Sequence, residues 1–173
     1  MRTELFWVEG PWPGRLAVLP RPRGGDWLGD EVRSWRQAGV GAVVSLLTPK
    51  EVAELDLAQE AELCRTNGIE LFSFPIIDRS VPSSQKATLA LVQQLDALLT
   101  GGTDVAIHCR QGVGRAALLA ACILVRSGTD PEVAFQRVSA ARGCLVPETT
   151  EQRKWVVAFA RALDALPRKI HNP

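Results

Sequence analysis

Short apolar runs alternate with longer helix-like segments along this chain, and this alternation is the feature that most limits its fold. The predicted strands are the apolar runs at 16–19, 42–47, 69–74 and 105–108. The run at 42–47, with two adjacent valines, is typical of a strand buried on both faces, whereas the run at 16–19 is predicted to lie at an edge of the sheet. Strands that alternate with helices predict an α/β fold, with a mainly parallel central sheet flanked by helices on both faces.

The intervening segments carry helical signals. Apolar residues at helical spacing, bounded by turn and capping residues, predict helices at 26–37, 50–65, 84–99, 115–126, from 131 onward and at 149–166. Asp26, Ser83 or Ser84, and Asp130 stand where the side chain of an N-cap residue is expected.

Length and composition exclude several classes of protein. With 173 residues and no long linker or repeat, the chain is expected to be a single domain over 1–173, with its core at about 15–165. The net charge is only +1, so no global charge attracts nucleic acid or an anionic membrane. No apolar run approaches the roughly 18 residues that span a bilayer, and the first 14 residues lack the apolar core of a signal peptide. Four cysteines without a C-x-x-C pair fit neither a zinc site nor a disulfide framework, so we expect a cytoplasmic protein, and a monomer.

One segment stands out chemically: it runs from His108 to Arg115 and reads H-C-R-Q-G-V-G-R. A predicted strand enters it and a predicted helix leaves it, at the edge of the sheet where such folds bind ligands. Inward-facing backbone N–H groups at a helix N-terminus form a nest for an anion such as phosphate. Gly112 and Gly114 allow the tight backbone, and Arg115 can hold two phosphate oxygens with its planar guanidinium. The same positive field stabilises a thiolate, so we expect Cys109 to be an ionised nucleophile.

Cys109 is the one cysteine followed six residues later by arginine. The equivalent positions after the other three are glutamate, glycine and threonine, and Cys64, Cys122 and Cys144 are expected to fill core or half-buried positions. A C-x5-R spacing alone is a weak signal, but a histidine before the cysteine and glycine at both loop positions make this match specific. The alternative for Cys109 is a buried structural thiol.

The segment resembles the H-C-x-x-G-x-x-R signature of protein tyrosine and dual-specificity phosphatases, and it is most similar to the compact dual-specificity and kinase-associated-phosphatase branches. The order of predicted elements agrees with that family from about residue 15 to 165. The resemblance implies a hydrolase that cleaves phosphate monoesters through a cysteinyl-phosphate, without a metal or other cofactor. It implies Cys109 as the nucleophile, Arg115 as the phosphate clamp and His108 as an organiser of the cysteine's surroundings. The phosphate cradle would be the backbone amides of Arg110, Gln111, Gly112, Val113, Gly114 and Arg115.

Asp78 is the candidate general acid. It lies between Pro75 and Pro82 in a predicted loop, and members of the family carry their acidic aspartate in a P-x-x-D segment at this point. An acid is needed because the leaving oxygen must be protonated. The alternative is a loop aspartate that caps a turn or pairs with Arg79. Asp104 is a weaker candidate, because it precedes the strand of the nucleophile and so lies at the wrong end of the sheet.

Gln152 stands at the start of the last predicted helix, in a segment similar to an E-T-x-x-Q run of the family. In some members a glutamine near this point positions the hydrolytic water. The alternative is a structural capping box with Thr149 as the N-cap. Arg21, Arg23 and Arg79 are further candidates to flank the site, although isolated arginines are more often solvated surface charges.

The expected substrate is a phosphorylated protein or peptide, with phosphotyrosine, phosphoserine and phosphothreonine as candidates. The loop has Arg110 beside neutral Gln111 and Val113, and so lacks the extra lysines of a phosphoinositide pocket. RNA 5′-phosphates and small phosphorylated metabolites stay open. Two other functions also stay open: a rhodanese-like sulfurtransferase, which uses a cysteine in a similar loop, and a catalytically weak phosphate-binding module.

Ala116 departs from the family, which usually has serine or threonine directly after the loop arginine. That hydroxyl stabilises the departing thiolate when the cysteinyl-phosphate is hydrolysed, so alanine is expected to slow the second step. We predict that pre-steady-state cleavage of an aryl phosphate shows a burst of phenol, and that Ala116→Ser raises the steady-state rate. Absence of a burst, together with no gain from Ala116→Ser, would contradict this expectation.

Overall fold

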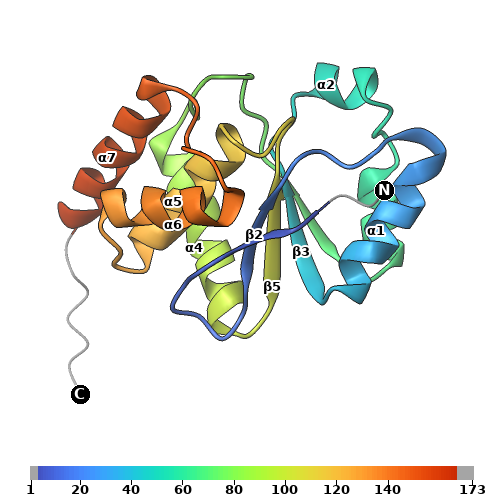
Figure 1. The fold of residues 1–173 in the computed structure, drawn as a ribbon, viewed down its shortest axis with the longest axis horizontal. Helices are drawn as coiled ribbons and strands as arrows, with labels where there is room; N and C mark the ends of the chain where they lie inside the picture. The colour runs from blue at the N-terminus through green and yellow to red at the C-terminus, as the bar shows by residue number, and fades with distance from the viewer. Residues whose placement is uncertain (1–3, 167–173) are drawn as a thin grey trace.

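The sheet of the computed structural model has five strands in the order β1-β2-β5-β3-β4 (Figure 1). The strands are β1 (Phe6–Val8), β2 (Leu16–Leu19), β3 (Val40–Ser45), β4 (Glu70–Ser73) and β5 (Asp104–His108). β1 is antiparallel to β2, and all other neighbours are parallel. The structure describes residues 4–166, so both ends of the expected domain lie outside the described residues.

Helices cover both faces of this sheet, as Figure 1 shows. They are η1 (Gly25–Trp27), α1 (Leu28–Gln37), α2 (Pro49–Glu54), α3 (Glu60–Thr66), α4 (Gln85–Thr100), α5 (Arg115–Arg126), α6 (Pro131–Arg142) and α7 (Thr150–Asp164). α1 and α3 pack on one face, whereas α4 and α5 pack on the other and α6 and α7 lie against α5. This arrangement confirms the predicted α/β fold. Within residues 4–166, no helix has the length and apolar character needed to cross a membrane.

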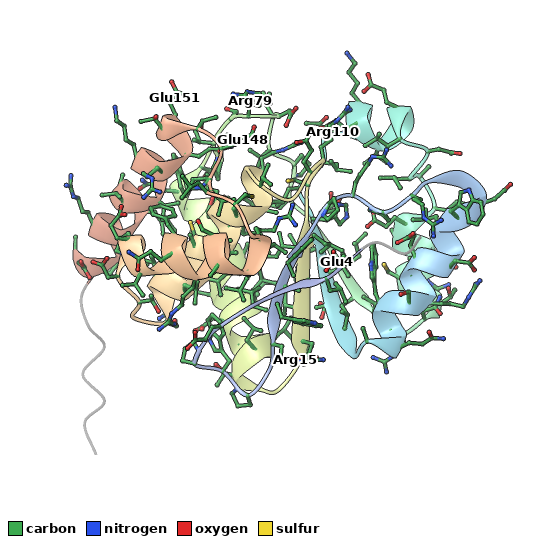
Figure 2. All side chains as sticks on the ribbon, in the orientation of Figure 1. Glu4, Arg15, Arg79, Arg110, Glu148 and Glu151 are labelled. Atoms are coloured by element: carbon green, nitrogen blue, oxygen red, sulfur yellow. The ribbon has the colours of Figure 1, made fainter. Side chains whose placement is uncertain are left out.

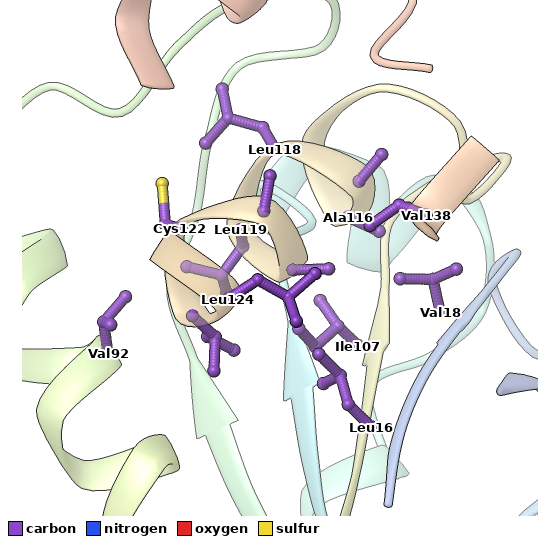
Figure 3. Close-up of a cluster of buried hydrophobic side chains, with 14 of the residues drawn as sticks. Leu16, Val18, Val92, Ile107, Ala116, Leu118, Leu119, Cys122, Leu124 and Val138 are labelled. Atoms are coloured by element: carbon purple, nitrogen blue, oxygen red, sulfur yellow. The ribbon is translucent and has the colours of Figure 1, made fainter. Parts of the chain in front are cut away.

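The alternation of side chains along the strands divides the core into two layers. Leu16 and Val18 of β2 join Ile107 of β5 beneath α5, while Ala17 and Leu19 point to the layer covered by α1. Figure 3 shows the first layer, where apolar side chains of α5 meet those of the strands. Every residue of α5 except the last is buried, which explains why this segment is apolar on all sides. The rigid contact of α5 with β5 fixes the loop that joins them.

Three local predictions were wrong. β2 is an internal strand with all four residues buried, because the unpredicted β1 pairs outside it. The expected helix at 50–65 is two helices, since α2 ends at Glu54 and Asp56 takes a left-handed φ of 54°. Asp26 lies inside η1 and caps no helix, whereas Ser84 and Asp130 do accept capping hydrogen bonds at the starts of α4 and α6.

Candidate active site

A pocket of about 160 Å³ opens where β5 ends and α5 begins. β5 lies between β2 and β3, so the loop at 109–114 projects from the centre of the sheet's carboxyl edge. The pocket is lined by Asp78, Arg79, Cys109, Arg110, Gln111, Val113, Gly114, Arg115 and Glu148. The structure therefore brings the predicted nucleophile, phosphate clamp and acid together. Figure 2 shows Arg79, Arg110 and Glu148 gathered at this end of the molecule, with Arg15 at the opposite end.

Cys109 lines the pocket, and the residue is 3% exposed. Its sulfur accepts a hydrogen bond from the backbone N–H of Gly112 at 3.2 Å. Gly112 has φ 72°, and a Cβ at this position would come within 2.6 Å of the carbonyl group of Leu19. Only glycine fits here without strain, because the end of β2 leaves no room for a side chain at this point of the loop.

The side chain of Arg115 is buried, and its guanidinium has several hydrogen-bonding and charged partners. Its guanidinium donates to both carboxylate oxygens of Glu51, at 2.7 and 2.8 Å, and to the carbonyl of Ile76 at 2.8 Å. A nitrogen of Arg115 also lies 2.9 Å from Oδ1 of Asp78. The hydrogen bonds from Arg115 outweigh burial and lower the pKa of Glu51 to about 2. Burial disfavours the charge of Arg115, yet its pKa is raised, because the hydrogen bond to Glu51 and the charges of Cys109, Glu51 and Asp78 favour the cation.

Glu51 was not predicted as a site residue, although a signal for its placement was present. The run Thr48-Pro49-Lys50-Glu51 has the spacing of a capping box. In the structure the Thr48 hydroxyl accepts from the Glu51 amide at 3.3 Å, and Glu51 Oε2 accepts from the Thr48 amide at 3.0 Å. The cap starts α2 at this point, so the same carboxylate fixes a helix end and faces Arg115.

Asp78 has two contacts in addition to its position at the pocket. Oδ1 accepts a hydrogen bond from the backbone N–H of Arg79 at 3.1 Å, and Oδ1 is also the atom near Arg115. Arg79 adopts φ 59° and pairs with Glu148 at 3.5 Å. The local turn contact expected of a loop aspartate is thus present, and it coexists with the contact to Arg115.

Gln152 forms the capping box that was considered as its alternative role. Its backbone N–H donates to the Thr149 hydroxyl at 3.1 Å, and its side-chain oxygen accepts from the backbone N–H of Thr149 at 3.3 Å. Its side-chain nitrogen also donates to the carbonyl of Ser80 at 3.1 Å. Gln152 is buried and is not among the lining residues of the pocket. It ties the start of α7 to the loop that carries Asp78.

His108 lies beneath the loop, outside the pocket. Its Nε2 is 2.7 Å from Oε1 of the buried Glu60 in α3, and its ring centroid is 6.2 Å from that of Trp35 in α1. The carbonyl of His108 accepts from the amide of Leu46 at 3.0 Å. These contacts hold the end of β5 beside β3.

Several other candidate positions do not line the pocket. Asp104 pairs with Arg15 at the opposite end of β5. The side chain of Arg21 donates to the carbonyl of Pro22, and its backbone N–H donates to the carbonyl of Arg110 at 3.2 Å, so Arg21 lies beside the loop without lining the pocket. Arg23 pairs with the buried Glu31 and does not line the pocket, whereas Arg79 does.

Of the remaining cysteines, two are buried as expected. Burial, with a smaller effect from the charge of Glu60, raises the pKa of Cys64 to about 12. Burial also raises the pKa of Cys122. Cys144 is exposed, so the prediction of a core or half-buried position was wrong for this residue. It follows the left-handed Gly143 that ends α6, where the chain turns outward.

Comparisons with known proteins agree with this geometry. Residues 19–129 match the family described as "Polymorphic toxin system, DSP-PTPase phosphatase". The chain is 24% identical over 144 residues to cyclin-dependent kinase inhibitor 3 of Rattus norvegicus, covering 78% of this chain and 68% of that protein. It is 25% identical over 132 residues to the Homo sapiens protein, covering 75% of this chain and 62% of that one.

Solved structures share the fold. A kinase associated phosphatase with its catalytic-site cysteine replaced by serine has a TM-score of 0.83 and 19% identity, over 96% of this chain and 98% of that one. The active form of Tk-PTP has a TM-score of 0.70 and 26% identity, over 86% and 92% of the two chains. The comparisons give no support to the rhodanese-like alternative.

The ion pair of Glu51 with Arg115 predicts a pH-dependent loss of stability. Because the pKa of Glu51 falls from the ordinary 4.5 to about 2 on folding, its contribution is complete above 4.5 and is lost as the pH falls toward 2. Glu51→Gln removes the buried carboxylate that holds the Arg115 guanidinium with two hydrogen bonds, so we expect the free energy of unfolding at pH 7 to fall by about 3 kcal/mol.

Denaturant unfolding at several pH values measures this effect. The difference between wild type and Glu51→Gln should shrink below pH 4.5. Glu62→Gln, which breaks an exposed pair with Arg65, is the matched control and should change stability little. A deficit of Glu51→Gln that stays constant down to pH 2.5 would show that the charge of Glu51 is not its cause.

Proposed function

The chain belongs to the DSP-PTPase phosphatase family and is a cysteine-dependent phosphatase, and we propose that Cys109, Arg115 and Asp78 carry out its two-step reaction on a phosphorylated protein. The observation that carries the proposal is the meeting of a sulfur, a guanidinium and a carboxyl group in one pocket, at the N-terminus of α5. We further propose that the catalytic domain spans about residues 15–165, and that the protein acts in the cytoplasm as a monomer.

In the first step the Cys109 thiolate attacks phosphorus and the bond to the leaving oxygen breaks. Asp78, in its protonated form, gives its proton to that oxygen, so the alcohol or phenol departs neutral. Arg115 and the amides of the loop hold the three equatorial oxygens of the transferring group, where negative charge is concentrated. The product of this step is a cysteinyl-phosphate.

In the second step water attacks the phosphorus of the cysteinyl-phosphate. Asp78, now a carboxylate, takes the proton from this water, and the S–P bond breaks to return the thiolate and release inorganic phosphate. Gln152 supports Asp78 indirectly, because its side-chain nitrogen donates to the carbonyl of Ser80 in the same loop. Its side-chain oxygen accepts from the Thr149 amide, so both polar atoms of the side chain already have protein partners. In this proposal Gln152 therefore holds the loop that carries Asp78 and does not bind the water.

The charges at the rim favour a single phosphate on a protein over a polyphosphorylated lipid. Apart from the buried Arg115, which is held by Glu51, the pocket is lined by two arginines, and both are already paired with carboxylates: Arg79 with Glu148 at 3.5 Å, and Arg110 with Glu54 at 3.3 Å. Little unpaired positive charge is left at the rim to bind a second phosphate. A phosphorylated tyrosine, serine or threonine side chain, with one phosphate on an otherwise neutral group, fits this balance.

Replacement of the nucleophile tests the mechanism directly. We expect Cys109→Ser to abolish hydrolysis of aryl phosphates and phosphopeptides, because serine at neutral pH is not ionised. Binding of inorganic phosphate should persist. Release of inorganic phosphate is the measurement. Cys122→Ser, at a buried cysteine outside the pocket, is the matched control and should retain activity. Substantial turnover by Cys109→Ser would rule out a thiolate nucleophile.

The acid is tested by its dependence on the leaving group. We expect Asp78→Ala to lower kcat by about 10²–10⁴-fold with phosphoserine peptides. The loss should be smaller with p-nitrophenyl phosphate, whose leaving group needs little protonation. Asp104→Ala removes a carboxylate from the opposite end of β5 and should leave kcat unchanged. Equal losses with both substrates would assign the proton transfer to another group.

A further inference from the structure

Arg142, the last residue of α6, contacts the loop at 109–114, the proposed phosphate loop, from outside the pocket. Its Nε donates to the carbonyl of Gly112 at 3.0 Å, and one terminal nitrogen donates to the carbonyl of Gln111 at 3.2 Å. Its guanidinium stacks on the ring of Phe6 in β1, 3.9 Å from the ring centroid. Arg142 is not among the lining residues, so it does not bind the phosphate itself.

We propose that Arg142 is a positioning residue that sets the direction of the phosphate-binding amides, an inference that rests on the proposed function of this loop. In a trans peptide the C=O and N–H groups point in opposite directions. The carbonyl of Gln111 shares its peptide with the N–H of Gly112, and the carbonyl of Gly112 shares its peptide with the N–H of Val113. A donor that holds both carbonyls outward therefore turns both N–H groups inward.

The contact at the sulfur agrees with this geometry. The Gly112 N–H that lies opposite the Arg142-bound carbonyl is the one that donates to Cys109 Sγ at 3.2 Å. Gly112 has no side chain to restrain its peptides, and its left-handed φ is one of several conformations open to glycine. Rotation of either peptide would turn a carbonyl oxygen toward the phosphate and the thiolate. Arg142 opposes that rotation from the outer side of the loop.

Phe6 gives this contact a rigid base. Its ring lies in β1, the edge strand that pairs with β2, and α6 packs against β1. Stacking on an aromatic ring restrains the guanidinium and leaves its N–H edge free to donate in the ring plane. The chain thus links its first strand to the geometry of the phosphate loop through one arginine.

The alternative is that Arg142 merely fastens the end of α6 to the body of the protein. Arg153 offers a matched control, because it also stacks on a ring, 4.3 Å from the centroid of Phe135, and pairs with Glu132 at 2.9 Å, yet makes no contact with the loop. A purely structural role would give Arg142→Met and Arg153→Met the same consequences.

The test compares orthovanadate affinity, Cys109 alkylation by iodoacetamide at pH 7, and Tm in the full chain. We expect Arg142→Met to weaken vanadate binding by about tenfold, which corresponds to about 1.4 kcal/mol, and to slow alkylation. Arg153→Met should change neither, although both variants lower Tm. Arg142→Lys, which can donate to one carbonyl but lacks the planar fork, should bind vanadate with intermediate affinity.

Wild-type vanadate affinity in Arg142→Met, with a lowered Tm, would overturn the inference. If Arg142→Met does not fold, Arg142→Lys decides in the same way: wild-type affinity overturns the proposal and weakened affinity supports it. The proposed function fails separately, if the wild-type protein binds vanadate but releases no phosphate from any phosphopeptide. In that event the comparison of vanadate affinities still tests the role of Arg142.

Discussion

The guanidinium of Arg115 is buried at the point where the segments that follow β3, β4 and β5 meet. A buried cation is costly unless it is paired and hydrogen-bonded, and here Glu51, the carbonyl of Ile76 and Asp78 supply the partners. One side chain thereby holds α2 and the loop before α4 against the start of α5. Two of these residues, Asp78 and Arg115, line the pocket, so their contact holds two sides of the pocket together.

The phosphate loop itself is held from two sides. β2 approaches so closely at Leu19 that Gly112 admits no side chain, while Arg142 holds the outward carbonyls. On the other flank Glu148 and Gln152 pack against Gly114, where a Cβ would meet both at about 3.0 to 3.1 Å. A loop with two glycines has little stiffness of its own, so its shape depends on these neighbours, which come from β2, the end of α6, the segment that joins α6 and α7, and the first turn of α7.

The sequence predicted those parts of the molecule that local signals determine. β5 and α5 carry apolar runs that end at a glycine-rich loop, and Ser84, Asp130 and Thr149 cap helices where such residues are expected. β1 was missed because it is short, and the break between α2 and α3 was missed because Asp56 is a non-glycine residue with positive φ.

The charged network of the site was also beyond a single sequence, because its pairs are remote. Glu51 and Arg115 are 64 residues apart, and Arg142 and Gly112 are 30 apart.

The contacts of Arg115 also suggest how a phosphate group would bind. Glu51 holds Arg115 with two hydrogen bonds and is buried, whereas Asp78 makes a single contact with Arg115 and its side chain is 53% exposed. In the proposed mechanism an arriving phosphate would therefore displace Asp78 and not Glu51, since the weaker and more solvated contact costs less free energy to break. Arg115 would then bind the phosphate, and Asp78, once protonated, would stand beside it as the proposed proton donor to the leaving oxygen.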